Sequence, residues 1–249
     1  MGFGLWALLA LLLGWPGASA RAASIQALFD EGTRAYQAGD YARAALAFGE
    51  AAARQPASGS LQNLGNAQWQ RGETGPAILA WERALWLDAF NRPARNNLRF
   101  ARKVAQLEAP ELSWYEVVST WLPIDWWAWI AGASFWLALG MVLLPGIFRR
   151  RKAAWHQAVA ALGLMVFLLS LPAHLGVYAR SRLGFVVERD APLRLTPTQA
   201  AQTLTLLSPG ESARVQRAHG RYLLVRTTRG QGWIQEGQFS LICPTRRDY

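Results

Sequence analysis

The chain has 249 residues, enough for one to three small domains, and its composition of 52% hydrophobic and 17% charged residues suggests membrane segments. The net charge of +10 comes mainly from arginines spread along the chain. No basic helix face with interleaved aromatics occurs, which argues against nucleic-acid binding. Cys243 is the only cysteine, which excludes an intrachain disulfide and a thiolate metal cluster.

Residues 1–20 have the pattern of a signal sequence. An apolar stretch from Leu5 to Leu13 is followed by Pro16, and Ala18-Ser19-Ala20 fits the small-residue pattern before a cleavage site. No Lys or Arg precedes the apolar stretch, so an uncleaved anchor is the alternative to cleavage after Ala20.

Residues 24–108 contain an internal repeat, because the chain matches itself after a shift of 33 residues. Gly32 then matches Gly65, and Gly39 matches Gly72. A period of this length is typical of stacked helical pairs. We expect Gly32 and Gly65 to allow close approach of two helices, and Gly39 and Gly72 to end the first helix of each pair in left-handed backbone.

The repeat resembles the tetratricopeptide repeat, or TPR, a helical hairpin whose stacks hold segments of partner proteins. Glu31 and Ala89 depart from the TPR pattern, which has Leu and Pro there. A third helix over residues 92–108 places Leu98 like Leu64 and is expected to cap the stack. The residues that match the motif are Gly32, Ala44, Phe48, Ala51 and Pro56 in the first copy, and Leu64, Gly65, Ala77, Trp81 and Ala84 in the second.

The TPR resemblance implies a shallow groove for a protein partner. Alternatively, Tyr36 and Trp69 simply pack on neighbouring helices. Phe29 stands where the clamp of some TPR proteins for a carboxyl terminus needs a basic residue, so that clamp is not expected here. The side chains expected on the inner face of the groove are Thr33, Tyr36, Gln37, Asn66, Trp69, Gln70 and Phe100.

A linker over residues 109–125 leads to two uncharged apolar runs, residues 126–148 and 154–178. Each has the length of a helix that crosses a bilayer core. Basic residues concentrate in cytoplasmic loops, so the connection over residues 149–153 is expected on the inside. Together with the signal sequence, this predicts a bacterial inner-membrane protein with both flanking domains in the periplasm. The basic residues of the loop are Arg149, Arg150, Arg151 and Lys152.

Residues 184–244 change to short alternating runs separated by turns, which suggests a small β-barrel. The stretches "APLRLTP", "LSPGESARV" and "GQGWI…SLI" resemble bacterial SH3-type domains, which often bind cell-wall peptides. Pro209-Gly210 is expected to form a turn between two strands, and Trp233 to be a core or edge aromatic. The side chains expected inside the barrel are Leu193, Leu195, Val215, Leu224 and Leu241.

Signs of catalysis are absent from the sequence. The only histidines are His156, His174 and His219, and the motifs of zinc proteases, serine hydrolases and phosphate-binding loops do not occur. We therefore expect a protein that is not an enzyme and has no metal or other cofactor.

Signal sequence, two TPRs, two spans and an SH3-type domain, in that order, resemble the BatE family, TPR proteins of the bacterial aerotolerance (Bat) operon. The strongest match is "LQNLGNAQWQRGETGPAILAWERALWLDAFNRPARNNLRFA". The resemblance implies a membrane-anchored adaptor for von Willebrand factor A-type membrane proteins that work with a MoxR-type ATPase, in a setting of stress or aerotolerance. The alternative is a sensor or anchor that binds cell-wall peptides through the SH3-type domain.

Overall fold

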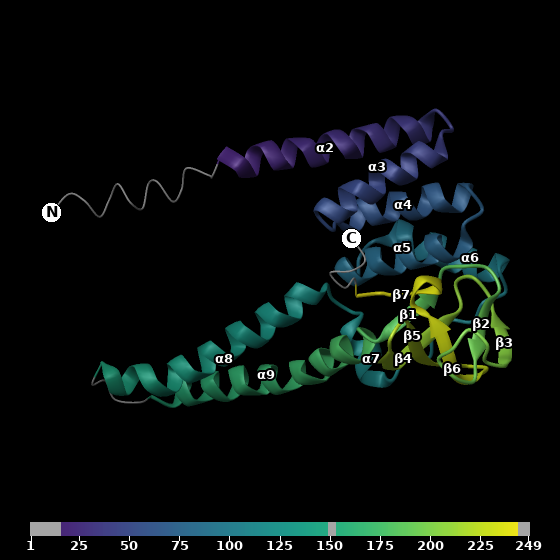
Figure 1. The fold of residues 1–249 in the computed structure, drawn as a ribbon. Coiled ribbons are helices and arrows are strands. Elements are labelled where there is room, and N and C mark those ends of the chain that lie inside the picture. Colours follow the sequence, from purple (N-terminus) through teal and green to yellow (C-terminus); the bar gives the residue numbers. More distant parts are fainter. Residues whose placement is uncertain (1–15, 149–152, 244–249) are drawn as a thin grey trace.

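The computed structural model describes residues 16–148 and 153–243, which form helices first and then the strands of one antiparallel sheet (Figure 1). This order agrees with the mixed helical and β content expected from the sequence. The helices are α2 (Pro16–Gln37), α3 (Tyr41–Arg54), α4 (Ser58–Gln70), α5 (Thr74–Leu87), α6 (Arg92–Val104), α7 (Trp114–Ser119), α8 (Ile124–Ile147) and α9 (Ala154–Arg180). The strands are β1 (Leu183–Val186), β2 (Ala191–Arg194), β3 (Thr203–Leu207), β4 (Ser212–His219), β5 (Tyr222–Thr227), β6 (Gly230–Gln235) and β7 (Phe239–Leu241), with a 3-10 turn, η1 (Glu236–Gln238), before β7.

Helices α2 to α6 form a stack in which each helix packs on the next (Figure 1). Gly39 and Gly72 lie just after α2 and α4 with φ of 77° and 75°, which confirms the left-handed backbone expected there. Asp40 then starts α3 by accepting a hydrogen bond from the backbone N–H of Arg43 at 3.0 Å. The proposed cleavage site at Ala20 lies inside α2, and most of the proposed signal sequence lies outside the described residues.

The repeat positions have the packing expected from their small and large side chains. A Cβ atom on Gly32 would lie 2.8 Å from the ring of Phe48, and one on Gly65 would lie 2.6 Å from Nε1 of Trp81. Both rings are buried. The missing side chains therefore make room for the rings, and this contact sets the distance between the two helices of each pair.

Glu31, which departs from the TPR pattern, forms an ion pair across the first helical pair. Its carboxylate accepts hydrogen bonds from Nε and Nη2 of Arg43 at 2.9 and 2.7 Å. These bonds, and then the charge of Glu31, raise the pKa of Arg43 above its ordinary value. A polar contact between α2 and α3 thus stands where the TPR pattern has an apolar Leu.

The seven strands are ordered β3-β2-β6-β5-β4-β1-β7, and every neighbouring pair is antiparallel. Leu207 on β3 and Phe239 on β7 come from opposite ends of this order, yet they belong to one buried cluster. The sheet must therefore curl around a single core. The cluster consists of Val186, Ala191, Leu193, Leu207, Ala213, Val225, Ile234 and Phe239.

The prediction of which side chains fill the core of the sheet is partly confirmed. Leu193 is buried, and Val215 and Leu241 pack against the cluster as partly buried side chains, while Leu224 is half-buried. The expectation for Leu195 is wrong, because this side chain is 57% exposed. A register shift between Leu193 and the next residue interrupts the inward–outward alternation, and β2 ends before Leu195. The expected turn between β3 and β4 is present, with φ of 86° at Gly210.

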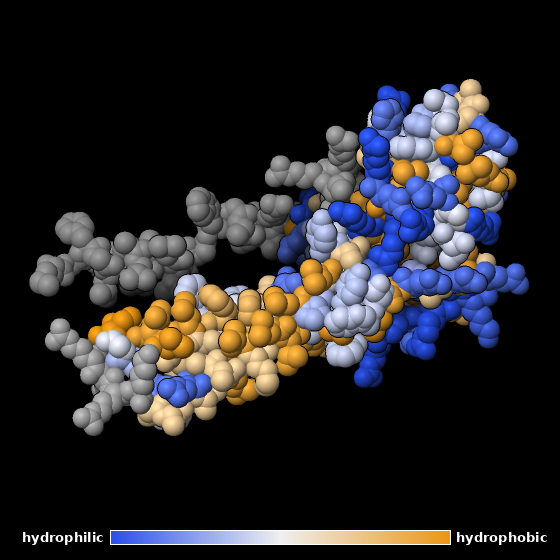
Figure 2. All heavy atoms as spheres, turned by 90° about the horizontal axis from the view of Figure 1, so that it is seen from below, coloured by the Kyte–Doolittle hydropathy of each residue, from blue (hydrophilic) through white to orange (hydrophobic). Residues whose placement is uncertain are grey.

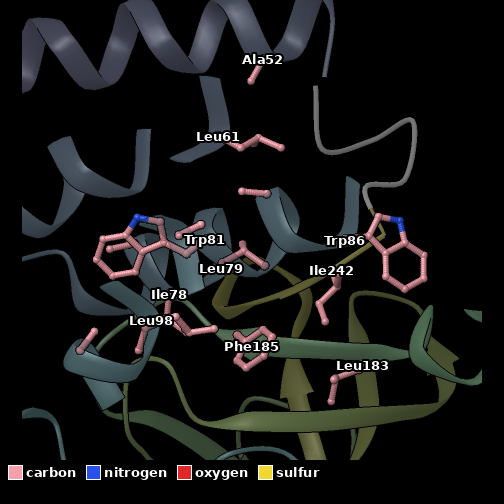
Figure 3. Close-up of a cluster of buried hydrophobic side chains, with 14 residues drawn as sticks. Ala52, Leu61, Ile78, Leu79, Trp81, Trp86, Leu98, Leu183, Phe185 and Ile242 are labelled. Atoms are coloured by element: carbon pink, nitrogen blue, oxygen red, sulfur yellow. The ribbon is translucent and has the colours of Figure 1, made fainter. Parts of the chain in front are cut away.

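The helical stack and the sheet share a second core, which was not expected from the sequence (Figure 3). Phe185 on β1 and Ile242 after β7 are fully buried in the same cluster as Ile78 on α5 and Leu98 on α6. Arg83 on α5 also donates hydrogen bonds to the backbone oxygen of the last residue of β7 at 3.2 and 2.9 Å. The described stack and sheet thus form one packed body.

Helices α8 and α9 form an antiparallel hairpin that projects from this body and is long and apolar enough to cross a membrane (Figures 1 and 2). Only 11% of the apolar window of α8 and 17% of that of α9 is buried, whereas a core helix of a soluble protein is mostly buried. A Cβ atom on Gly163 would lie 2.9 Å from the backbone oxygen of Ser134, so the two helices approach closely at small residues. The basic loop residues 149–152 lie outside the described residues.

The close approach at Gly65 gives a stability prediction. Gly65→Ala places a methyl group against Trp81, whose ring is buried and donates hydrogen bonds to two residues of α4. We expect a loss of about 1–3 kcal/mol, typical of an overpacked core. Gly59→Ala in the same helix is the control, because nothing lies within 4 Å of its Cβ position, and it should gain up to about 1 kcal/mol. Thermal unfolding of the detergent-solubilised variants measures both; equal melting temperatures would contradict the prediction.

Candidate partner-binding surface

The seven proposed groove residues lie on α2, α4 and α6, and the structure brings them together in two groups. The first group lines a shallow cleft of about 140 Å³. This volume is below the roughly 300–1,000 Å³ of pockets for small molecules, so the cleft suits a segment of a protein better than an enclosed ligand. Its lining consists of Thr33, Tyr36, Gln37 and Asn66 from the proposed set, with Phe48 and Asn63.

The second group continues the surface from α4 to α6. Trp69 packs against Phe100 with the ring centroids 6.0 Å apart and the ring planes nearly perpendicular. Trp69 also contacts Trp81 at 6.0 Å, so its other side belongs to the core. Phe100 is 58% exposed and Gln70 is exposed, which leaves an aromatic and an amide side chain open to a partner.

Other members of the set are engaged in packing. Oδ1 of Asn66 accepts hydrogen bonds from Nε1 of Trp81 at 3.0 Å and from Nδ2 of Asn97 at 2.7 Å, so this side chain ties α4 to α5 and α6. Tyr36 packs edge-to-face on Tyr41 with a centroid distance of 5.3 Å. The hydroxyl of Thr33 donates to a backbone oxygen of its own helix at 2.9 Å. The exposed residues Gln37, Gln70 and Phe100 are therefore the best candidates for direct contact with a partner protein.

Sequence reasoning missed two asparagines at this surface. Asn63 lines the cleft, and Asn97 joins α6 to α4 through its hydrogen bond to Asn66. Asn63 belongs to the Asn-Leu-Gly-Asn motif and Asn97 to the Asn-Asn-Leu motif, so the signal was present in the sequence as asparagines at similar places in α4 and α6. The amide of Asn97 thus helps to fix the spacing of α4 and α6, while Asn63 contributes to the wall of the cleft.

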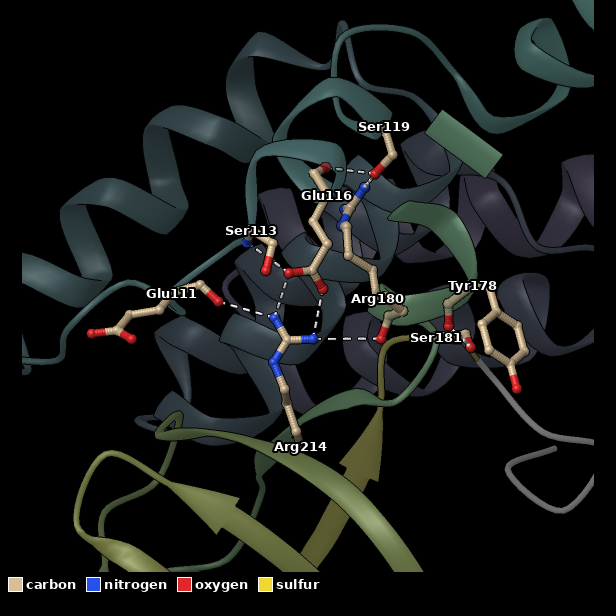
Figure 4. Close-up of polar contacts among 9 residues, drawn as sticks. Glu111, Ser113, Glu116, Ser119, Tyr178, Arg180, Ser181 and Arg214 are labelled. Carbon is tan, nitrogen blue, oxygen red and sulfur yellow. Dashed lines mark hydrogen bonds and ion pairs between the residues drawn. The ribbon is translucent and has the colours of Figure 1, made fainter. Parts of the chain in front are cut away.

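An ion pair with a buried carboxylate joins the linker, α7 and the sheet (Figure 4). Glu116 on α7 is 1% exposed, and its carboxylate accepts two hydrogen bonds from Arg214 on β4 at 2.6 and 2.9 Å. The same carboxylate accepts the backbone N–H of Ser113 at 2.7 Å, and Arg214 also donates to the backbone oxygen of Glu111 at 2.9 Å. Bidentate bonding of this kind offsets the cost of burying the carboxylate and fixes α7 against the sheet.

Comparison with known proteins adds no relative: neither a scan against protein-family models nor a search of the curated proteins finds a match to this chain. Over the described residues, no group of three or more His, Cys, Asp or Glu side chains is placed to hold a metal ion.

The ion pair gives the second prediction. Arg214→Met leaves the carboxylate of Glu116 buried without its guanidinium, and we expect a loss of about 3 kcal/mol in stability. Hydrogen exchange should rise in α7 and at the start of α8. Arg217→Met removes the same charge from an exposed position of the same strand and should change stability by less than about 0.5 kcal/mol. Similar exchange in both variants would show that the pair does not hold α7 in place.

Proposed function

We propose that this protein is a membrane-anchored adaptor that holds a partner protein on the surface formed by α2, α4 and α6. One observation carries the proposal. The sheet covers the stack on the side of α5, which is buried along most of its length, while Gln37, Gln70 and Phe100 stay exposed on the other helices. An exposed aromatic flanked by amides, on a rigid and otherwise well-packed stack, is suited to binding a protein.

The nature of the stack supports this proposal. The close contacts at Gly32 and Gly65 and the left-handed glycines that follow α2 and α4 agree with two TPR units capped by α6. Because TPR stacks generally hold segments of other proteins, the resemblance to the BatE family makes von Willebrand factor A-type membrane proteins the proposed partners. The setting would be a Bat and MoxR-type complex linked to stress or aerotolerance.

The membrane arrangement is part of the same proposal. Because α8 and α9 are antiparallel, the stack and the sheet lie at the same end of the hairpin (Figure 1). If the hairpin crosses the inner membrane, both units face the same compartment; the basic loop residues and the proposed signal sequence support the periplasm as that compartment.

A second candidate function is the binding of cell-wall peptides by an SH3-type sheet. Trp233 on β6 packs edge-to-face on His219 with a centroid distance of 6.2 Å, and Tyr222 pairs with His219 at the end of the hairpin formed by β4 and β5. These partly exposed rings are the observation in its favour. An isolated fragment from Gly184 onward is a poor test, because it would expose Phe185, which is fully buried against the stack.

Site-specific photocrosslinking tests the adaptor proposal. A benzophenone amino acid at position 100 should crosslink a von Willebrand factor A-type membrane protein in the native membrane, and the same amino acid at position 46, which is 73% exposed on α3, should not. Gln70→Arg should lower the yield at position 100 roughly fivefold, equivalent to about 1 kcal/mol of binding. Gln55→Arg makes the same exchange at an exposed position after α3 and should leave the yield unchanged.

Equal crosslinking from positions 100 and 46, or none from either, would refute the adaptor proposal. The wall-binding alternative is then tested with the full chain, since the sheet needs the stack for its packing. Sedimentation with purified cell wall that is lost in Trp233→Ala would make the sheet the working surface.

Cysteine labelling tests the membrane arrangement. In a Cys243→Ser background, Ala53→Cys and Gln216→Cys introduce thiols at exposed positions of the stack and the sheet. A membrane-impermeant maleimide added to intact spheroplasts should label both. Arg150→Cys in the loop should react only after the membrane is permeabilised. Labelling of the loop thiol in intact spheroplasts would contradict the proposed orientation.

A further inference from the structure

A second and larger cleft, of about 600 Å³, lies where the packed body meets the hairpin. Its walls come from α5, α6, the linker, the end of α7 and the start of β1, and Arg180 at the end of α9 forms part of them. Phe90, which lines the cleft, packs against Trp126 at the start of α8 with a centroid distance of 6.4 Å. The cleft thus lies at the end of the apolar helices, where a membrane surface would be.

The cleft is rich in arginine. Four arginines, Arg95, Arg99, Arg102 and Arg180, line it together with a single carboxylate, that of Glu82. Glu82 forms a salt bridge with Arg102, and the other nearby buried carboxylate, Glu116, is taken by Arg214. The pairing leaves an excess of positive charge on the walls of the cleft.

Arg180 is a buried member of this group of positive charges. It is only 7% exposed, and it forms no salt bridge with any residue that the structure describes. Nη1 donates a hydrogen bond to Oγ of Ser119 at 3.2 Å, while Nε is buried without an acceptor (Figure 4). Nε of Arg102 is also buried without an acceptor. The carboxylates of Glu82 and Glu116 act on Arg180 only through space, and both are already paired with other arginines. A buried cation without a salt bridge of its own is costly, and buried N–H groups normally have partners, so the charge on these walls favours an anion as the ligand of the cleft.

Aromatic residues surround this positive charge. The guanidinium of Arg180 lies 5.1 Å from the ring centroid of Trp86. Trp121 lines the cleft and is 62% exposed, and Phe90 is 55% exposed. Exposed aromatic rings at the end of apolar helices are typical of the level of lipid headgroups. The occupant should therefore combine an anionic group with an apolar part.

We propose that this cleft binds the phosphate of an anionic phospholipid headgroup, with its acyl chains beside the hairpin. Guanidinium groups suit this role because their forked N–H donors match the oxygens of a phosphate. Basic pockets beside membrane helices bind such headgroups by the same electrostatics. The site would fix the depth and tilt of the hairpin relative to the body. This proposal rests on the membrane setting of the proposed function, but not on the partner surface.

Native mass spectrometry of the purified full chain tests the proposal. The protein is released from mixed micelles that contain equal amounts of phosphatidylglycerol and phosphatidylcholine. The wild type should retain more phosphatidylglycerol than phosphatidylcholine. Arg95→Gln combined with Arg99→Gln, both exposed on the wall of the cleft, should weaken retention roughly tenfold. Arg92→Gln on the same helix is exposed and does not line the cleft, and it should retain the lipid as the wild type does.

Thermal unfolding with and without phosphatidylglycerol separates loss of the site from loss of the fold. The lipid should raise the melting temperature of the wild type but not of Arg180→Lys, which keeps the charge and loses the fork. Equal retention of the two lipids by the wild type, or equal retention by the double variant, would overturn the proposal. Stabilisation by inorganic phosphate as strong as that by the lipid would show a site for the free anion and would also overturn it. Because no partner protein is present, these results are independent of the crosslinking at position 100.

Discussion

Phe185 on β1 is fully buried against the helical stack, in a cluster that includes Ile78 on α5 and Ile242 after β7. The arrangement of the whole chain depends on this contact. Ser181 and Arg182 are the only residues between α9 and β1, so the position of β1 determines where the hairpin ends. Because β1 packs on α5, the apolar hairpin, the curled sheet and the stack have fixed positions relative to one another. Burial of a large aromatic side chain here is worth about 2–3 kcal/mol relative to exposure.

Local features of the chain were predictable because their causes lie close together in the sequence. The glycine that ends α2 and the one that ends α4 need left-handed backbone, and the paired small and large side chains at Gly32 and Gly65 recur in register. The docking of β1 was not predicted, since the sequence analysis treated the repeat and the barrel as separate domains. All four residues of β1 are buried, although a strand with one free face alternates, so the continuous run "LGFV" was an unused signal of packing on both faces.

The polar contacts were harder to predict from the sequence. Glu116 and Arg214 are 98 residues apart in the sequence and meet only because α7 and β4 are brought to the same side of the hairpin base. No periodicity marks such a pair. Asn66 shows the opposite difficulty, because its place on the inner face was predicted from the repeat, but its hydrogen bonds to Trp81 and Asn97 depend on neighbouring helices. A repeat gives the face on which a side chain lies, whereas its partners depend on how the neighbouring helices pack.

The fixed connection between stack and hairpin bears on which function the molecule suits. A flexible tether would let a bound partner explore many distances from the membrane, whereas here α5 joins the exposed surface on α4 and α6 to β1 and so to the end of α9. A partner on that surface would therefore be held at a set height and orientation. The arginine-lined cleft beside Trp121 lies at the base of the same connection, so an anion bound there would brace the body against the membrane. Because packing within this chain already fixes the position of this surface, a protein that binds there would lose less conformational entropy than on a flexible tether.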